Sequence, residues 1–165
     1  MDTDEFWEII RRARAFDDPE HGLQAELTQR STEEIRLFDR EMDLALNAAY
    51  SWALWGVGYI AEGGMSDDAF EYFRTWLIMQ GREAFEKVVA DPDSLSELPV
   101  PESGGYEFEG PQYVASILYA DRTGGKWPTH DDIHLPELGD GWDFDDPKEM
   151  TARYPRMIAL VNSRW

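Results

Sequence analysis

The chain has 165 residues, of which 42% are hydrophobic and 13% aromatic, including seven Trp. This composition excludes a disordered chain and fits a single domain with a substantial core. Lys and Arg number 15 against 34 for Asp and Glu, which gives a formal net charge of −19. Such a surface repels phosphate backbones and anionic membranes, so we expect neither nucleic acid nor a membrane as a partner.

The sequence also restricts the chemistry and the location of the protein. It contains no Cys, which excludes disulfides, thiolate chemistry and Cys-ligated zinc. The longest apolar run, 45–61, is interrupted by Asn47 and Ser51 and predicts a buried helix, not a membrane span. No apolar run of signal-peptide length occurs near the start, so we expect a cytoplasmic protein. The oligomeric state stays open.

Capping residues and helical spacing predict helices through the first part of the chain. Asp2 or Thr3 can cap a first helix that ends at 17–19, and a short helix follows it. Ser31 and Glu34 form a capping box that opens a long helix. The almost wholly apolar stretch 48–60 predicts a helix that is packed between its neighbours.

The stretch 66–80 is predicted to be the central helix of the fold. Gly63 and Gly64 end the preceding helix, and Ser66 is a good cap for the next one. Asp67 would lie in the first turn, where an acid is stabilised by the positive end of the helix dipole. Aromatic and aliphatic side chains follow on nearly every side, which indicates burial between neighbouring helices.

Helices, a surface loop and an acidic segment complete the chain. Helices are predicted at 82–90 and at 111–123, with the loop between them. Residues 126–147 are irregular and acidic, and we expect Trp127 and Trp142 to hold this segment against the body.

Together these patterns predict a mainly α fold, with 1–165 as a single domain of about six to seven helices around the aromatic-rich helix 66–80. The helical body would cover about 1–125 and the irregular acidic segment 126–147. One or two short helices would follow in 148–163.

Several short motifs resemble DUF4240, a bacterial family of uncharacterised domains. They are Phe6-Trp7, Ser66-Asp67-Asp68 with Phe70, Tyr72-Phe73-Arg74, Trp76-Leu77-Ile78, Gly81-Arg82, Phe85 and Asp91-Pro92. The resemblance covers roughly residues 1–120 and is most specific between Ser66 and Phe85. It implies the boundaries of the fold and carries no established activity.

One candidate site lies beside the central helix. Its residues would be Asp68, Tyr72, Arg74, Trp76 and Arg82. Arginine forms bidentate bonds with carboxylates and phosphates, so Arg74 and Arg82 could clamp an anionic ligand. The alternative is structural: Asp67 and Asp68 are acids of the first helical turn, and the arginines pair with internal acids, which are abundant in a chain of this charge.

A second candidate site lies in the acidic segment. The residues Asp140, Trp142, Asp143, Phe144 and Asp145 would form a negative, aromatic patch that docks a basic partner. The segment lacks the Gly and the closing Glu of an EF-hand loop, so a calcium loop of that kind is excluded. The alternative is a solvated acidic surface without a partner.

Metal and nucleophile motifs are weak or absent. His130 and His134 are four residues apart, but no Glu follows His130 as a His-Glu-x-x-His motif requires. A third ligand would have to come from elsewhere, for example His21. No Gly-x-Ser-x-Gly elbow and no phosphate-binding loop occurs. We therefore expect no metal and no cofactor, and whether the protein is an enzyme stays open.

Two hypotheses for the function follow. The first is an acidic interaction protein that docks a basic protein or peptide, in the manner of an inhibitor or accessory factor. The second is an enzyme or small-ligand binder that recognises an anionic group through Arg74 and Arg82 beside the central helix.

Overall fold

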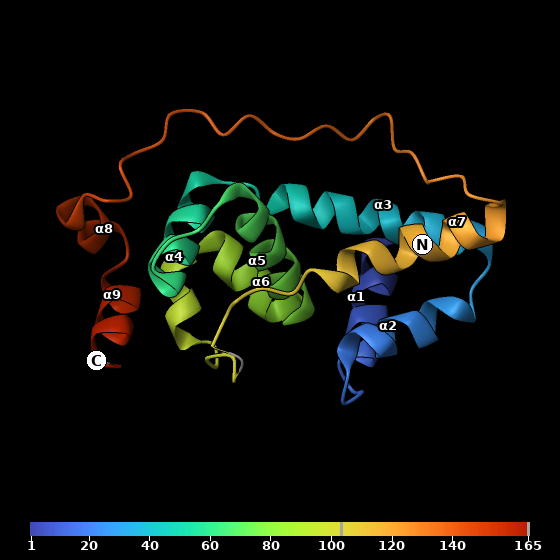
Figure 1. Cartoon of the computed structure of the whole chain (residues 1–165), viewed down its shortest axis with the longest axis horizontal. Coiled ribbons are helices and arrows are strands. Elements are labelled where there is room, and N and C mark those ends of the chain that lie inside the picture. The colour runs from blue at the N-terminus through green and yellow to red at the C-terminus, as the bar shows by residue number, and fades with distance from the viewer. Residues whose placement is uncertain (103, 165) are drawn as a thin grey trace.

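The computed structural model describes residues 1–102 and 104–164, and all of their regular elements are helices (Figure 1). In chain order these are α1 (Thr3–Ala13), α2 (Pro19–Thr28), α3 (Thr32–Ala48), α4 (Trp52–Glu62), α5 (Asp67–Met79), α6 (Arg82–Ala90), the 3₁₀ helices η1 (Pro92–Glu97) and η2 (Gly110–Tyr113), α7 (Val114–Thr123), α8 (Pro147–Arg153) and α9 (Pro155–Asn162). The predicted fold class, mainly α, is confirmed.

The predicted caps Ser31 and Ser66 are confirmed, and of the two alternatives for the first helix the structure shows Asp2 as the cap. Each of these side chains accepts a hydrogen bond from a backbone N–H in the first turn of its helix. Ser31 and Glu34 form the complete capping box, in which each side chain also bonds to the other residue's backbone N–H. The left-handed Gly63, at φ 71°, ends α4 as expected. These local features depend only on neighbours in the sequence.

The helix predicted over the apolar stretch 48–60 is present as α4, but its predicted start is wrong. Helix α3 ends at Ala48, and α4 begins only at Trp52. Between them Ser51 adopts an extended conformation, and its hydroxyl accepts a bond from the Leu54 N–H at 3.2 Å. The stretch is interrupted because a serine hydroxyl caps a new helix better than it continues an old one.

Helix α5 lies at the centre of the core, in contact with α3, α4, α6 and η2. Its residues from Phe73 to Met79 are all buried. The ring of Phe70 stacks on Trp55 of α4 at 4.7 Å between centroids, and Trp76 meets Tyr106 edge to face at 5.0 Å. The predicted burial of this aromatic helix is therefore confirmed.

The segment between α7 and α8 contains no helix and runs past α3 and α4 in a long arc (Figure 1). Trp142 lies against the core, as expected, with the Arg153 guanidinium 3.8 Å from its ring. The expectation for Trp127 is wrong, because 60% of this residue is exposed. Other side chains of the body hold the segment instead: Asn47 donates to the His134 carbonyl and Trp52 to the Gly139 carbonyl, each at 3.0 Å.

The last two helices are docked on the body. Helix α9 contacts η1 and α4. The buried carboxylate of Asp93 accepts bonds from the backbone N–H groups of Arg156 and Met157, at 3.0 and 2.8 Å, so it caps the start of α9 from outside the helix. None of the described helices combines the length and the apolar character that a membrane span requires.

Candidate functional site

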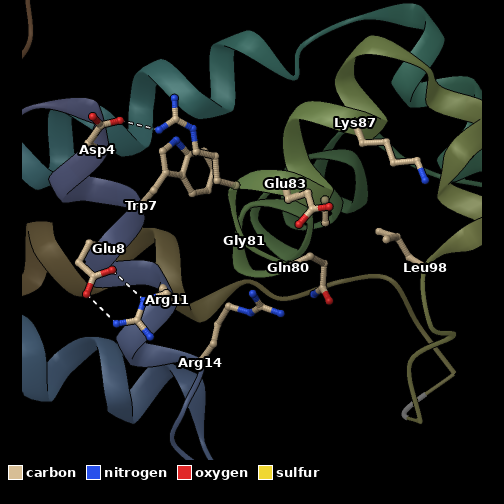
Figure 2. A pocket seen from close by; sticks show the side chains of 12 residues that line it. Asp4, Trp7, Glu8, Arg11, Arg14, Gln80, Gly81, Glu83, Lys87 and Leu98 are labelled. Carbon is tan, nitrogen blue, oxygen red and sulfur yellow. Dashed lines mark hydrogen bonds and ion pairs between the residues drawn. The ribbon is translucent and has the colours of Figure 1, made fainter.

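A cavity of about 590 Å³ lies between α1 and the start of α6 (Figure 2). We call it the α1–α6 cleft. Its charged lining residues are Asp4, Glu8, Arg11, Arg14, Arg82, Glu83 and Lys87. Several cationic side chains of a strongly acidic protein therefore lie at one cavity. Those that have no acidic partner are free to bind a ligand.

Gly81 shapes the floor of the cleft. It is the N-cap residue of α6, has φ 93°, and gives the helix no side-chain cap. The first N–H groups of α6 therefore have no side chain of the cap residue to satisfy them. A Cβ at this position would lie 2.4 Å from Nη1 of Arg14, so only glycine lets the guanidinium rest against the helix start.

Arg14 is unpaired in the part of the chain that the structure describes. It follows the last residue of α1, and its side chain points into the cleft towards Gln80 (Figure 2). No hydrogen bond or ion pair joins it to residues 1–102 or 104–164. An unpaired guanidinium beside an uncapped helix start places two positive groups together, and both favour an anion.

The other cations of the cleft have partners. Arg11 forms a bidentate pair with Glu8, and the bonds from Arg11 and then Arg12 lower the pKa of that carboxyl to about 2. Arg82 pairs with Asp4 of α1 at 2.5 Å and with Glu86 at 2.7 Å, contacts that raise its pKa. Lys87 pairs with Glu97. These pairs hold the walls of the cleft together.

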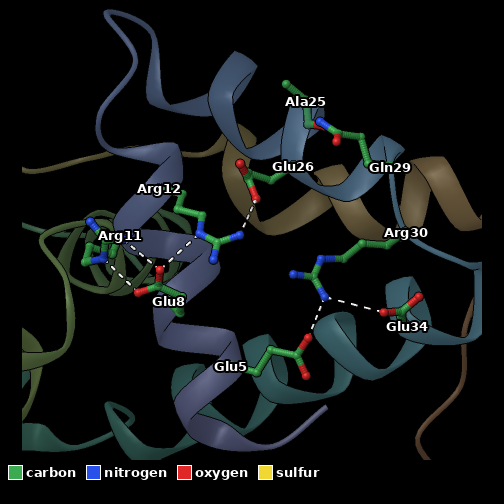
Figure 3. A network of polar contacts seen from close by, with 9 residues as sticks. All are labelled: Glu5, Glu8, Arg11, Arg12, Ala25, Glu26, Gln29, Arg30 and Glu34. Carbon is green, nitrogen blue, oxygen red and sulfur yellow. Dashed lines mark hydrogen bonds and ion pairs between the residues drawn. The ribbon is translucent and has the colours of Figure 1, made fainter.

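A network of charged side chains on α1, α2 and α3 occupies the neighbouring arginines (Figure 3). Arg12 bonds to Glu8 at 3.0 Å and lies 3.7 Å from Glu26 of α2. Arg30 bonds to Glu5 of α1 at 2.6 Å. Because this network holds α1 between α2 and α3, it also fixes the position of Arg14 at the end of α1.

Glu83 gives the cleft a second, opposite binding group. It lies in the first turn of α6 and lines the cavity with Arg14 (Figure 2). The described residues offer it no hydrogen-bond or ion-pair partner. A ligand with an anionic group at Arg14 and a cationic group at Glu83 would satisfy both charges.

The residues expected beside the central helix do not come together in one site. Only Arg82 lines the α1–α6 cleft. Arg74 is buried, donates from Nη1 to the Leu46 carbonyl at 3.0 Å, and lies about 5 Å from aromatic rings on α5 and before α4. Trp76 belongs to the core, Tyr72 is half-buried, and Asp68 is exposed in the first turn of α5.

The residues expected to dock a basic partner divide into two groups. Trp142 and Phe144 pack against the body, and Phe144 meets Tyr59 at 5.3 Å between ring centroids. Asp145 accepts a bond from the Tyr59 hydroxyl at 2.7 Å. Asp143 and Asp140 are exposed. The carboxylates therefore face solvent, whereas Phe144 lies against α4 and Trp142 lies between Phe144 and Arg153 of α8.

Sequence reasoning missed Arg14, Gly81 and Glu83. The signal for Gly81 was present, because a glycine before a new helix leaves that helix without a side-chain cap. Nothing local connects residue 14 with residue 81. Away from the cleft, the potential ligand atoms of Asp39, Asp43 and His130 lie within 4.8 Å of one another.

The comparisons with known proteins give the family of the chain. Residues 1–121 match the family described as "Protein of unknown function (DUF4240)", and the chain belongs to this family. The match includes every residue that lines the α1–α6 cleft and ends near the close of α7. Neither a curated protein nor a solved structure matched the chain.

Proposed function

We propose that the protein binds a small molecule with a carboxylate or phosphate group in the α1–α6 cleft. The observation that carries this proposal is the unpaired guanidinium of Arg14 against Gly81, at the uncapped start of α6. In a chain with 34 acidic residues, an arginine at a cavity has many internal partners to choose from, yet none is placed at Arg14.

Each group of the cleft has a distinct role in this proposal. Arg14 donates two parallel N–H bonds to an oxyanion, as guanidinium groups do with carboxylates and phosphates. The first N–H groups of α6 bind a further oxygen of the same group. Glu83 accepts a bond from an ammonium group where the ligand carries one. Arg82 forms part of the cleft wall and does not bind the ligand, because Asp4 and Glu86 already pair with its guanidinium.

Calorimetric titration with three probes tests the proposal. Inorganic phosphate tests the oxyanion alone, glutarate tests a dicarboxylate, and glutamate adds an ammonium group to the same carbon skeleton. We expect phosphate or glutarate to bind, and Arg14→Gln to weaken that binding at least tenfold, the loss of about 1.4 kcal/mol expected when one charged contact is removed. Glu83→Gln should weaken glutamate more than glutarate.

Arg36→Gln is the matched control. It also removes one guanidinium, but Arg36 pairs with Glu33 on α3 and does not line the cleft. Its affinity for the probes should stay within twofold of the unmodified protein. The proposal fails if no probe binds at about 10 mM, or if Arg36→Gln weakens binding as much as Arg14→Gln.

The acidic segment supports a second candidate function, the docking of a basic protein or peptide. The carboxylates of Asp131, Glu137 and Asp140 are exposed, and the described residues offer them no partner. Trp142 and Phe144 would hold the segment in place instead of touching the partner. The affinity of such a surface comes from charge and falls steeply with salt.

A lysine-rich peptide is the probe for this second function. The variant Asp131→Asn/Asp140→Asn should weaken its binding, and Asp17→Asn/Asp121→Asn, which removes the same charge elsewhere, should not. Equal loss in both variants would indicate a general charge effect and would reject a docking surface. We expect a cytoplasmic location for the protein under either proposed function, and cell fractionation tests this expectation.

A further inference from the structure

A partly buried cluster of two carboxylates and one imidazole lies away from the cleft. Asp39 and Asp43 are one turn apart on α3 and therefore share a face of the helix. His130 comes from the segment after α7, and its Nε2 lies 2.9 Å from Oδ2 of Asp39. Helix α7 contacts α3, which brings the start of this segment to the acidic face.

The imidazole of His130 is incompletely satisfied. Only 4% of its side chain is exposed, and Nδ1 is buried with no hydrogen-bond partner among the described residues. Whichever nitrogen carries the proton, one polar atom of the ring lacks a protein partner. Nε2 faces Asp39, so it is the nitrogen that an ion shared with the carboxylates would bind, and Nδ1 would then carry the ring proton.

Asp39 and Asp43 bring two carboxyl groups close together in a partly buried position. Burial raises the pKa of Asp39 to about 6, opposed by the bond to His130 and increased by the neighbouring Asp43. Burial also raises the pKa of Asp43, for which the described residues provide no hydrogen bond. Arg40, the closest arginine in the sequence, pairs with Asp132 instead. Among the residues that the structure describes, no Lys or Arg pairs with either carboxylate.

We propose that Asp39, Asp43 and His130 bind one divalent transition-metal ion. Carboxylate oxygen together with imidazole nitrogen is a ligand set that suits Zn²⁺, Mn²⁺ or Fe²⁺ better than Ca²⁺ or Mg²⁺. Ligand atoms at right angles on an ion with bonds of about 2.1 Å are about 3 Å apart. The separation of 2.9 Å between Nε2 of His130 and Oδ2 of Asp39 matches that spacing.

A second cavity reaches the two carboxylates, although His130 does not line it, and would give the ion access and room for further ligands. It has a volume of about 260 Å³ and is lined by Asp39, Asp43, Glu71 and Trp127, among others. Three protein ligands leave coordination positions open to water or to a small molecule in this cavity, as in catalytic metal sites. Glu71, which accepts a bond from Gln112 at 2.9 Å, can orient such a water.

The site is independent of the function proposed for the α1–α6 cleft. None of its three ligands lines that cleft. His134, the other histidine of the segment, lies outside the cluster, and His21 lies on α2 beside Phe16. These two residues therefore provide matched controls for the removal of an imidazole.

The test uses the full chain, free of any histidine tag and stripped of metal with a chelator. Titration with Zn²⁺, followed by calorimetry, should give one ion per chain. Mn²⁺ binding, followed by the loss of the free-ion electron paramagnetic resonance signal, should compete with Zn²⁺ for the same site. His130→Ala and Asp43→Asn should each weaken Zn²⁺ binding at least tenfold, and His134→Ala should leave it within twofold.

Further measurements keep the result interpretable. Circular dichroism shows whether each variant is folded, and Zn²⁺ should raise the Tm of the unmodified protein but not of His130→Ala, because a bound ion stabilises only the folded state. The proposal is overturned if the stripped protein binds no Zn²⁺ or Mn²⁺ at about 1 mM, or if His134→Ala loses as much affinity as His130→Ala. Ca²⁺ binding as tight as Zn²⁺ binding would also overturn it.

Discussion

The hydroxyl of Tyr154 lies directly over Gly56 and donates to the Ala53 carbonyl at 2.8 Å. A Cβ at residue 56 would lie only 2.5 Å from that hydroxyl oxygen. Burial raises the pKa of Tyr154, which keeps the hydroxyl protonated and able to donate. This contact joins the C-terminal helices, which lie beyond the family match, to α4 within it.

Gly56→Ala should therefore destabilise the protein despite its better helix propensity. The gain of about 1 kcal/mol from replacing a helical glycine is outweighed by overpacking, which costs about 1–3 kcal/mol, and by the strained Tyr154 bond. Denaturant unfolding should show a net loss of about 1–2 kcal/mol. Gly58→Ala is the control. The new Cβ would contact the flexible end of Met65, so the free energy of unfolding of this variant should change less. The reverse order of the two variants would contradict this account.

Asp93→Asn should weaken the docking of α9. The buried carboxylate accepts two backbone N–H bonds at the start of α9 and a bond from Arg156 Nε. Loss of the charge should cost about 1–3 kcal/mol, because these are charge-assisted bonds to a buried group. Asp91→Asn removes an exposed partner of the same arginine and should cost less than about 1 kcal/mol. Thermal unfolding of the two variants would separate these effects.

We expect Arg74 to stabilise the fold and not to bind a ligand. Its guanidinium lies among Tyr50, Phe70 and the Leu46 carbonyl, and burial lowers its pKa. Arg74→Ala should cost about 2–4 kcal/mol of stability through lost packing, and Arg74→Met, which keeps the volume, should cost less. Neither change should alter the affinity of a folded variant for glutarate or phosphate. A large loss of affinity without loss of stability would return Arg74 to the candidate site.

Gly81→Ala should affect both the stability and the binding of the cleft. A Cβ is strained at φ 93°, which costs about 1–2 kcal/mol, and it would displace the Arg14 guanidinium. The expected loss of glutarate or phosphate affinity should disappear when Arg14 is already Gln, because the two residues act through one contact. Calorimetry on the two single variants and the double variant measures this coupling. Additive losses would mean that Gly81 acts independently of Arg14.

The capping box of α3 should stabilise the protein in a pH-dependent way. Bonds from the Ser31 side chain and backbone lower the pKa of Glu34 below its ordinary value of 4.5. A carboxyl with a lowered pKa contributes stability above about pH 4.5, which is lost as the pH falls through the folded-state value. Glu34→Gln should therefore have a lower Tm than Glu137→Gln at pH 7. The difference between the two variants should shrink as the pH falls below about 4.5, and a constant difference would exclude this mechanism.

The sequence by itself determined the local features of the fold. A serine followed by an acid three residues later starts α3, and Gly63 ends α4, because such caps require only neighbouring backbone groups. The burial of α5 also followed from composition, since a helix with apolar and aromatic side chains on nearly every side must lie between neighbours. The break at Ser51 shows the limit, because the same serine fits a helix interior or a cap.

Only the tertiary structure decided which charged groups have partners. Arg74 and Arg82 looked equivalent in sequence, yet one lies among aromatic rings and the other lines a cleft. Two contacts join residues that are far apart in the chain: Arg14 lies against Gly81, and His130 bonds to Asp39. Spacing along a helix fixes only which side chains share a face. The packing of α1 beside α6, and of the 126–146 segment over α3, decides which of those faces meet.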